Sequence, residues 1–215
     1  MLRATLSNEW FTVILIICLF ILASVKYLFP IRFLDFLATP GNSKYLKVYS
    51  RNQKFIDLFD GLLYANFSIS LALFTFILYK TQIEVIHFDL SLFLKITFGI
   101  AALFLIKILL ERLIASAFNI DELIDNYLFQ KTSYKNYLGV ILLPINLILI
   151  FNITPNNNIF IIIIGFLLLI NSIGFVTSFK THQKLIISNL FYFILYLCAF
   201  EIAPYIILYK VFIES

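Results

Sequence analysis

Residues 10–29 read WFTVILIICLFILASVKYLF, a run of twenty residues in which Lys26 carries the only charge. A bilayer core about 30 Å thick needs roughly 20 apolar residues in one helix. The run therefore predicts a membrane-spanning helix, which Pro30 closes at its carboxyl end. Arg3 precedes the run as in a signal peptide, but the run is long and no small-residue cleavage site follows it. We therefore expect an uncleaved anchor.

The rest of the chain has the same apolar character. Of its 215 residues, 62% are hydrophobic and 13% are charged. A soluble domain has about a quarter charged residues, because its surface must be covered largely by polar groups. A soluble enzyme and a nucleic-acid-binding protein are therefore excluded. We expect an all-α polytopic membrane helical bundle, with no soluble domain, that forms a single integral membrane domain over residues 1–215.

Five further apolar stretches follow the first. They cover residues 57–79, 91–113, 137–151, 159–179 and 185–209, which makes about six transmembrane helices. The stretch 137–151 is short and contains Pro144, so it is either a re-entrant segment or a span that extends back towards Tyr134. Residues 119–136 are mixed in charge and have apolar positions at helical spacing. They predict a short helix that lies on the membrane surface.

The segment between the first two spans is too short for a domain. Residues 30–37 predict an interfacial helix or a continuation of the first span, and residues 39–43 predict a turn. A basic stretch follows, with Lys44, Lys47, Arg51 and Lys54. These four residues are candidates for contact with anionic lipid headgroups or with a partner. Simple anchoring of a cytoplasmic loop is the favoured alternative.

Lysine and arginine are unevenly shared between the two sides of the predicted membrane. Nine lie in the loops after the first, third and fifth spans, and three lie on the opposite side. Basic loops are retained in the cytoplasm. The count therefore predicts a multi-pass protein of the bacterial inner membrane with both termini outside the cytoplasm.

The sequence contains no phosphate-binding glycine loop, zinc-protease motif or nucleophile elbow. Its two cysteines and two histidines do not have the spacing of metal ligands. We therefore expect no catalytic residue, no metal and no cofactor. The candidates that remain are ionisable residues in the spans, because a charge in hydrocarbon is costly unless it serves a purpose.

Five such residues lie near the predicted cytoplasmic ends of the second and third spans: Asp57, Asp60, Lys107, Glu111 and Arg112. They form either a headgroup, substrate or proton site, or an interhelical ion-pair network, and the network is favoured. Lys107 is expected to pair with Asp60 or Glu111.

Glu201 is the one acidic residue deep in a predicted span. It is expected to face the bundle interior and to meet Lys95 or, failing that, a Tyr or Asn side chain. Asn66 and Asn146 are expected to form hydrogen bonds between helices. The six glycines form no GxxxG pair, so we expect the helices to pack through bulky side chains rather than by close backbone contact.

The six-span pattern, the stretch Tyr137-Leu-Gly-Val-Ile-Leu-Leu-Pro-Ile-Asn146 and the abundance of Ile, Phe, Asn and Lys resemble an uncharacterised inner-membrane family of Bacteroidota, known as a domain of unknown function. The resemblance implies an inner-membrane location and no activity, catalytic residue or cofactor.

Two functions are therefore considered. The favoured one is a non-catalytic subunit, scaffold or accessory component of a cell-envelope complex for secretion, motility or lipid handling. Its partners are the lipid bilayer and other membrane protein subunits. The alternative is a small membrane enzyme or carrier for a lipid-linked substrate that uses the charge cluster of the second and third spans.

Overall fold

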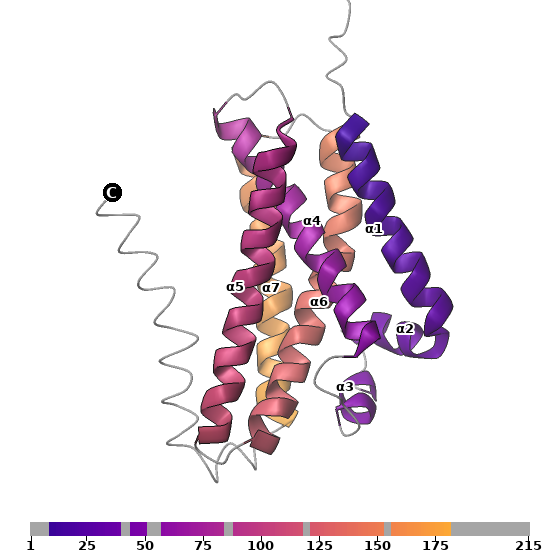
Figure 1. Ribbon diagram of the computed structural model, residues 1–215, viewed down its shortest axis with the longest axis vertical. Coiled ribbons are helices and arrows are strands. Elements are labelled where there is room, and N and C mark those ends of the chain that lie inside the picture. The colour runs from indigo at the N-terminus through magenta and orange to yellow at the C-terminus, as the bar shows by residue number, and fades with distance from the viewer. Residues whose placement is uncertain are drawn as a thin grey trace, which may run out of the picture.

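Every regular element that the structure describes is a helix. The computed structural model describes residues 9–39, 44–50, 57–83, 88–117, 121–152 and 156–181 (Figure 1). Along the chain its helices are α1 (Glu9–Leu28), α2 (Pro30–Leu37), α3 (Lys44–Tyr49), α4 (Leu58–Ile83), α5 (Leu90–Ala117), α6 (Asp121–Phe151) and α7 (Asn157–Thr181). All except α2 and α3 are long and apolar enough to cross a membrane. The expectation of an all-α polytopic bundle is confirmed, whereas the sixth predicted span, 185–209, lies outside the described residues.

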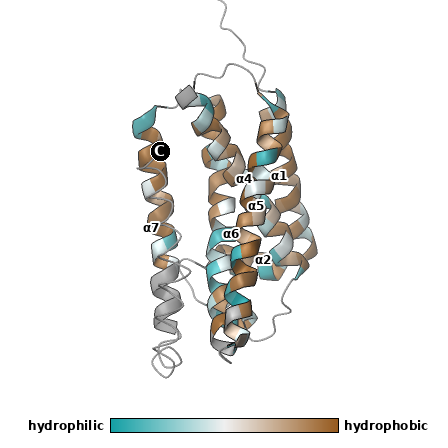
Figure 2. Ribbon diagram, turned by 60° about the vertical axis from the view of Figure 1, so that its left-hand side comes forward, coloured by the Kyte–Doolittle hydropathy of each residue, from teal (hydrophilic) through white to brown (hydrophobic). Residues whose placement is uncertain are grey.

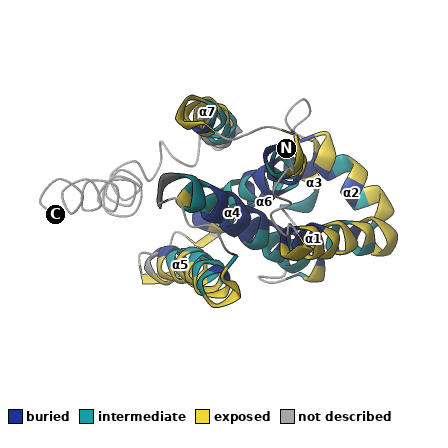
Figure 3. Ribbon diagram, turned by 90° about the horizontal axis from the view of Figure 1, so that it is seen from above, coloured by how far each residue is buried: buried dark blue, intermediate teal, exposed yellow. Residues whose placement is uncertain are grey.

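Helices α4 and α6 form the centre of the bundle. Of their membrane-spanning windows, 56% and 44% are buried, against 28% for α1, 11% for α7 and 6% for α5. Figure 3 shows this difference as dark central helices among largely exposed outer ones. The side chain of Asn146 donates to the carbonyl of Ser70 at 2.8 Å, and that of Asn136 donates to the carbonyl of Asp60 at 3.5 Å. The same offset in both bonds means that α4 and α6 run parallel. The bond to Ser70 confirms the interhelical role expected of Asn146. The same expectation is wrong for Asn66, whose side-chain amide is buried and makes no hydrogen bond among the described residues.

The two central helices touch through backbone at Gly139. An ideal Cβ at this position would lie 2.5 Å from the Cα atom of Phe67 and 3.0 Å from its amide nitrogen. Only glycine permits such an approach. The expectation that the helices pack through bulky side chains alone is therefore wrong at this crossing, because a single glycine that faces a neighbouring backbone needs no GxxxG pair. Elsewhere the core does consist of bulky residues, including a cluster of Phe11, Phe76 and Phe93.

Helix α6 corrects two expectations about residues 119–151. It is one continuous helix of 31 residues, so residues 121–136 are not a separate surface helix and residues 137–151 are not a re-entrant segment. Ile124, Tyr127 and Leu128 are buried in the bundle, which anchors the first half of the helix. The lysines in that half have partners on α5, described below, so their charge does not expel the segment. Pro144 lies inside α6 without ending it.

Helix α1 ends at Leu28, and Pro30 is the first residue of α2. Proline has no N–H to continue the preceding helix, and its fixed φ suits the start of a new one. Phe33 and Phe36 are buried, whereas Ile31 and Leu34 are exposed. An apolar outer face is typical of a helix at a membrane interface. Brown, apolar residues also cover most of the long helices in Figure 2.

Helices α2 and α3 close one end of the bundle. The ring of Phe36 on α2 contacts Tyr45 on α3 and Phe59 in the first turn of α4. Tyr45 also packs against Phe129 of α6. We call this end, where α2 and α3 meet the start of α4, the capped end of the bundle.

Candidate functional site

The five charged candidates of the second and third spans lie towards the capped end and divide among three groups of ion pairs. Asp57 and Asp60, at the start of α4, bind Arg32 of α2. Lys107 and Glu111 of α5 lie with Lys131 of α6. The remaining candidate is Arg112, which pairs with Asp125 of α6. Each group joins at least two helices.

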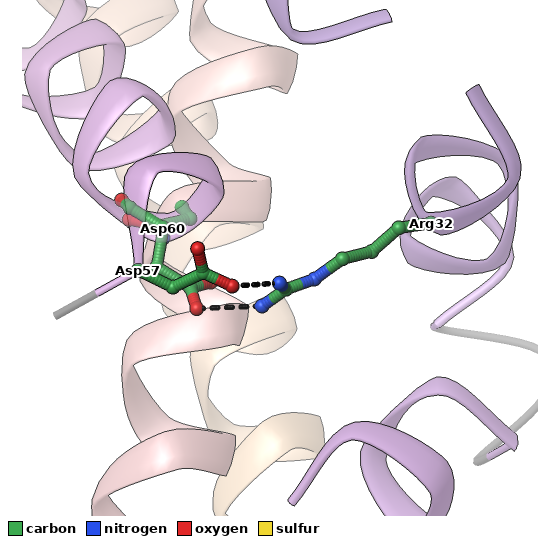
Figure 4. A network of polar contacts seen from close by, with 4 residues as sticks. Arg32, Asp57 and Asp60 are labelled. Atoms are coloured by element: carbon green, nitrogen blue, oxygen red, sulfur yellow. Dashed lines mark hydrogen bonds and ion pairs between the residues drawn. The ribbon is translucent and has the colours of Figure 1, made fainter. Parts of the chain in front are cut away.

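Arg32 holds both aspartates. Figure 4 shows its guanidinium reaching from α2 to the two carboxylates at the start of α4. One nitrogen, Nη1, donates to Asp57, and Nη2 donates to Oδ2 of Asp60 at 2.8 Å. The guanidinium also lies over the ring of Phe59, with Cζ 4.3 Å from the ring centroid. Because its planar fork matches two acceptors and stacks on the ring, Arg32 is fixed in this geometry.

The surroundings of Arg32 favour its charged form. Burial lowers the pKa of the guanidinium, but the charge of Asp60 and the hydrogen bond to Asp57 more than offset this effect, so the pKa lies above its usual value. Tyr45 of α3 is fully buried beside the group. Burial raises the pKa of the Tyr45 hydroxyl, and Asp60 acts in the same direction, against the lowering effect of Arg32 and Ser133. Tyr45 is therefore neutral throughout the physiological range.

Glu111 is the most enclosed acidic residue that the structure describes. Its side chain is 0% exposed, and its Oε1 atom accepts a hydrogen bond from Lys131 Nζ at 2.7 Å. Lys107 Nζ lies 4.0 Å from the same oxygen. The expected pairing of Lys107 is thus met by Glu111, four residues further along α5, while Asp60 is bound by Arg32. The charge of Lys131 cancels a carboxylate that would otherwise be buried at high cost.

Other charged side chains near the capped end make contacts outside the Arg32 and Glu111 groups. Arg112 Nε lies 3.5 Å from Asp125 Oδ1, and both side chains are exposed. Lys44, at the start of α3, lies 3.2 Å from Asp35 of α2. One turn of α6 beyond Lys131, Lys135 lies over the ring of Phe104, with Nζ 4.4 Å from the centroid.

Sequence reasoning did not identify Arg32 and Lys131 as site residues, because both were counted only as loop charges. A signal was present for each. Two aspartates that open an apolar helix require a counter-charge, and Arg32 lies on the amphipathic segment just before them. Lys131 lies one turn from Lys135 on a segment whose apolar residues already had helical spacing.

The remaining candidates are only partly described. Lys47 lies on α3. Lys95 is exposed, near the start of α5 and far from the capped end. Arg51, Lys54 and Glu201 lie outside the described residues, so the pairing of Glu201 with Lys95 stays a prediction.

Long apolar helices around two buried central ones, with charges paired at one end, define a polytopic α-helical membrane protein. Within that class, the family model described as Domain of unknown function (DUF4271) matches residues 11–212, nearly the whole chain. The chain belongs to this family, and the resemblance noted from its sequence is confirmed. No curated protein and no solved structure matches it.

Proposed function

We propose that this chain is a non-catalytic subunit, a scaffold or accessory component, of a bacterial cell-envelope complex in the inner membrane. The observation that carries the proposal is the double contact of Arg32 with Asp57 and Asp60. A pair of carboxylates near the membrane boundary is the element of the charge cluster best suited to acid–base chemistry. Here the guanidinium binds both, so the pair serves to join α2 to α4.

The other charged candidates support the same proposal. Glu111 is fully buried between Lys131 and Lys107, and this group joins α5 to α6. A carboxylate enclosed in this way cannot meet a substrate without the helices separating. Interhelical pairs of this kind set the register of one helix against another. The alternative function, an enzyme or carrier for a lipid-linked substrate, requires these same residues to exchange partners during each cycle.

The outer helices suit contact with lipid and with helices of partner subunits. Large apolar side chains are exposed along α5 and α7, among them Phe98, Leu103, Ile162 and Leu169. The orientation we propose follows the excess of basic residues on the side of the capped end, in loops and in the helix turns next to them. It places that end in the cytoplasm and both termini outside it.

The proposal is tested by replacing the Arg32 group with neutral residues of similar shape. The triple variant Arg32→Gln, Asp57→Asn, Asp60→Asn keeps the helices joined without charge, so it should still assemble. The measurement is the mass of the tagged chain after mild-detergent extraction at native expression, by size-exclusion chromatography with light scattering. We expect wild type and triple variant to elute in the same complex, with one partner protein at a fixed ratio to the chain.

Two results would count against a non-catalytic subunit. One is a wild-type chain that elutes alone, with lipid as its sole companion. The other is a triple variant that folds and assembles as wild type does but fails to complement a strain lacking the chain. That second result would assign the carboxylates a chemical role.

A further inference from the structure

Positive charge converges where α5 meets α6. Lys131 and Lys107 both approach the single oxygen Oε1 of Glu111, at 2.7 Å and 4.0 Å. Their ammonium groups therefore lie within about 7 Å of each other. Lys135 follows Lys131 by one turn of α6, so it lies on the same face of that helix. Two lysines thus approach one fully buried carboxylate, and a third lies one turn of α6 away, over the ring of Phe104.

These lysines lie towards the capped end of the bundle, which is where the proposed orientation puts the cytoplasmic boundary of the membrane. Asn136, next to Lys135, contacts the carbonyl of Asp60 in the first turn of α4. Above this level the helices are predominantly apolar, and below it α2 and α3 close the bundle. The side chains of Lys107 and Lys131 are 22% and 12% exposed, so they are largely withdrawn from water but still reachable. Long lysine stems at this depth direct their ammonium groups towards the headgroup layer.

Two ammonium groups that share one carboxylate repel each other, and the repulsion is strong where water is scarce. An anion that bridges them relieves this repulsion. A phosphate is well suited, because its oxygens accept hydrogen bonds from several ammonium groups at once. At this depth the phosphate of a lipid headgroup is present at high local concentration, and anionic lipids are attracted to basic residues at the membrane surface.

We propose that Lys107, Lys131 and Lys135 form a binding site for a phosphate-bearing anion at the α5–α6 boundary. The ion pair with Glu111 holds the ammonium group of Lys131 in place, so Lys131 orients the bound anion. Lys107 and Lys135 supply further positive charge to that anion. Phe104, on whose ring Lys135 lies, forms the apolar wall of the site. The site does not depend on the proposed subunit function, since it would hold an anion in either a scaffold or an enzyme.

The test uses the full chain in nanodiscs made of equal parts of phosphatidylcholine and phosphatidylglycerol. Native mass spectrometry measures the ratio of the two lipids that stay bound. The test variant is Lys107→Gln with Lys135→Gln, which leaves the Glu111–Lys131 bond in place. Its matched control is Lys95→Gln, which removes a lysine from the far end of α5. The double variant Lys107→Arg with Lys135→Arg keeps both charges.

Wild type should retain phosphatidylglycerol in preference to phosphatidylcholine. The preference should fall roughly fivefold for each lysine removed from the site. The Lys95→Gln control and the arginine variant should keep it. Should the glutamine double variant not fold, Lys135→Gln alone is measured, because its lysine contacts a ring rather than the buried carboxylate.

A second measurement identifies the source of the phosphate. Inorganic phosphate is added to the chain in nanodiscs of phosphatidylcholine alone, and the thermal midpoint is followed. The site takes a free anion if phosphate raises the thermal midpoint of wild type but not of the glutamine double variant, and if the first measurement shows no preference between the two lipids. The proposal is overturned if neither probe binds, or if Lys95→Gln lowers binding as much as the glutamine double variant does.

Discussion

At the scale of single residues, burial determines how much each ion pair contributes to stability. The side chains of Arg32 and Asp60 are 12% and 16% exposed, whereas that of Lys44, which pairs with Asp35, is 60% exposed. Exposed pairs are screened by water and contribute little. When one member of an enclosed pair is removed, the other charge remains without compensation, and this is costly.

Arg32→Met should therefore destabilise the protein by about 3 kcal/mol, because it leaves Asp57 and Asp60 facing each other without a counter-charge. The matched control is Lys44→Met, which should cost about 1 kcal/mol or less. Unfolding in detergent, followed by tyrosine fluorescence as denaturant is added, measures both. Equal effects of the two substitutions would show that the Arg32 group is no more enclosed than a surface pair.

The ion pairs around Glu111 predict an order for the stability lost on three substitutions. Lys131→Met removes the partner at 2.7 Å from a fully buried carboxylate and should cost about 3 kcal/mol. Lys107→Met should cost about 1 kcal/mol, because Lys131 still neutralises Glu111. Arg112→Met, at the exposed pair with Asp125, should cost no more than Lys107→Met. Thermal midpoints of the three variants test this order, and a Lys107→Met variant less stable than Lys131→Met would reverse the assignment of the principal partner.

The raised pKa of Tyr45 predicts that the stability of the protein depends on pH in the alkaline range. This pKa is raised in the folded protein, so the native state favours the neutral hydroxyl. The stability that this provides is complete below the unfolded pKa of about 10 and is lost as pH rises from there towards the native pKa. Tyr45→Phe should therefore lose less stability than wild type above about pH 10. The exposed Tyr27, as Tyr27→Phe, is the control and should follow wild type; a Tyr45→Phe profile that also follows wild type would refute the prediction.

At the scale of helices, the α4–α6 crossing depends on Gly139. Alanine at this position would drive its Cβ into the backbone of Phe67, so Gly139→Ala should cost about 1–3 kcal/mol by overpacking. Gly99 of α5 has nothing within 4 Å of an added Cβ. Gly99→Ala should be neutral, or stabilising by up to about 1 kcal/mol through helix propensity. Thermal midpoints in detergent measure both, and a tolerated Gly139→Ala would mean that α4 and α6 are farther apart than described.

The sequence predicted the helices better than their contacts. Continuous apolar runs define α1, α4, α5 and α7 because about 20 apolar residues span the bilayer core. The first half of α6 was recognised as helical but was placed on the membrane surface, because Lys131 and Lys135 suggest contact with water until their partners Glu111 and Phe104 are known. Gly139 was overlooked for a similar reason. Whether a glycine faces a neighbouring backbone depends on how two helices cross, and no local pattern records that.

At the scale of the whole molecule, the bundle has two unlike ends. The capped end contains α2, α3 and the paired charges around Arg32 and Glu111, whereas α6 and α7 meet at the opposite end, near Asn157. Charges that join helices at one end hold the bundle together without occupying its apolar middle. The central proposal is that this molecule crosses the membrane with its capped end in the cytoplasm.

Cysteine labelling in intact cells tests that claim most directly. In a background with Cys18→Ala and Cys198→Ala, single cysteines are placed at two exposed positions, Val48→Cys on α3 and Asn157→Cys at the start of α7. A membrane-impermeant maleimide should label Asn157→Cys in intact cells and should label Val48→Cys only after the membrane is permeabilised. Labelling of Val48→Cys in intact cells, or protection of Asn157→Cys, would contradict the account.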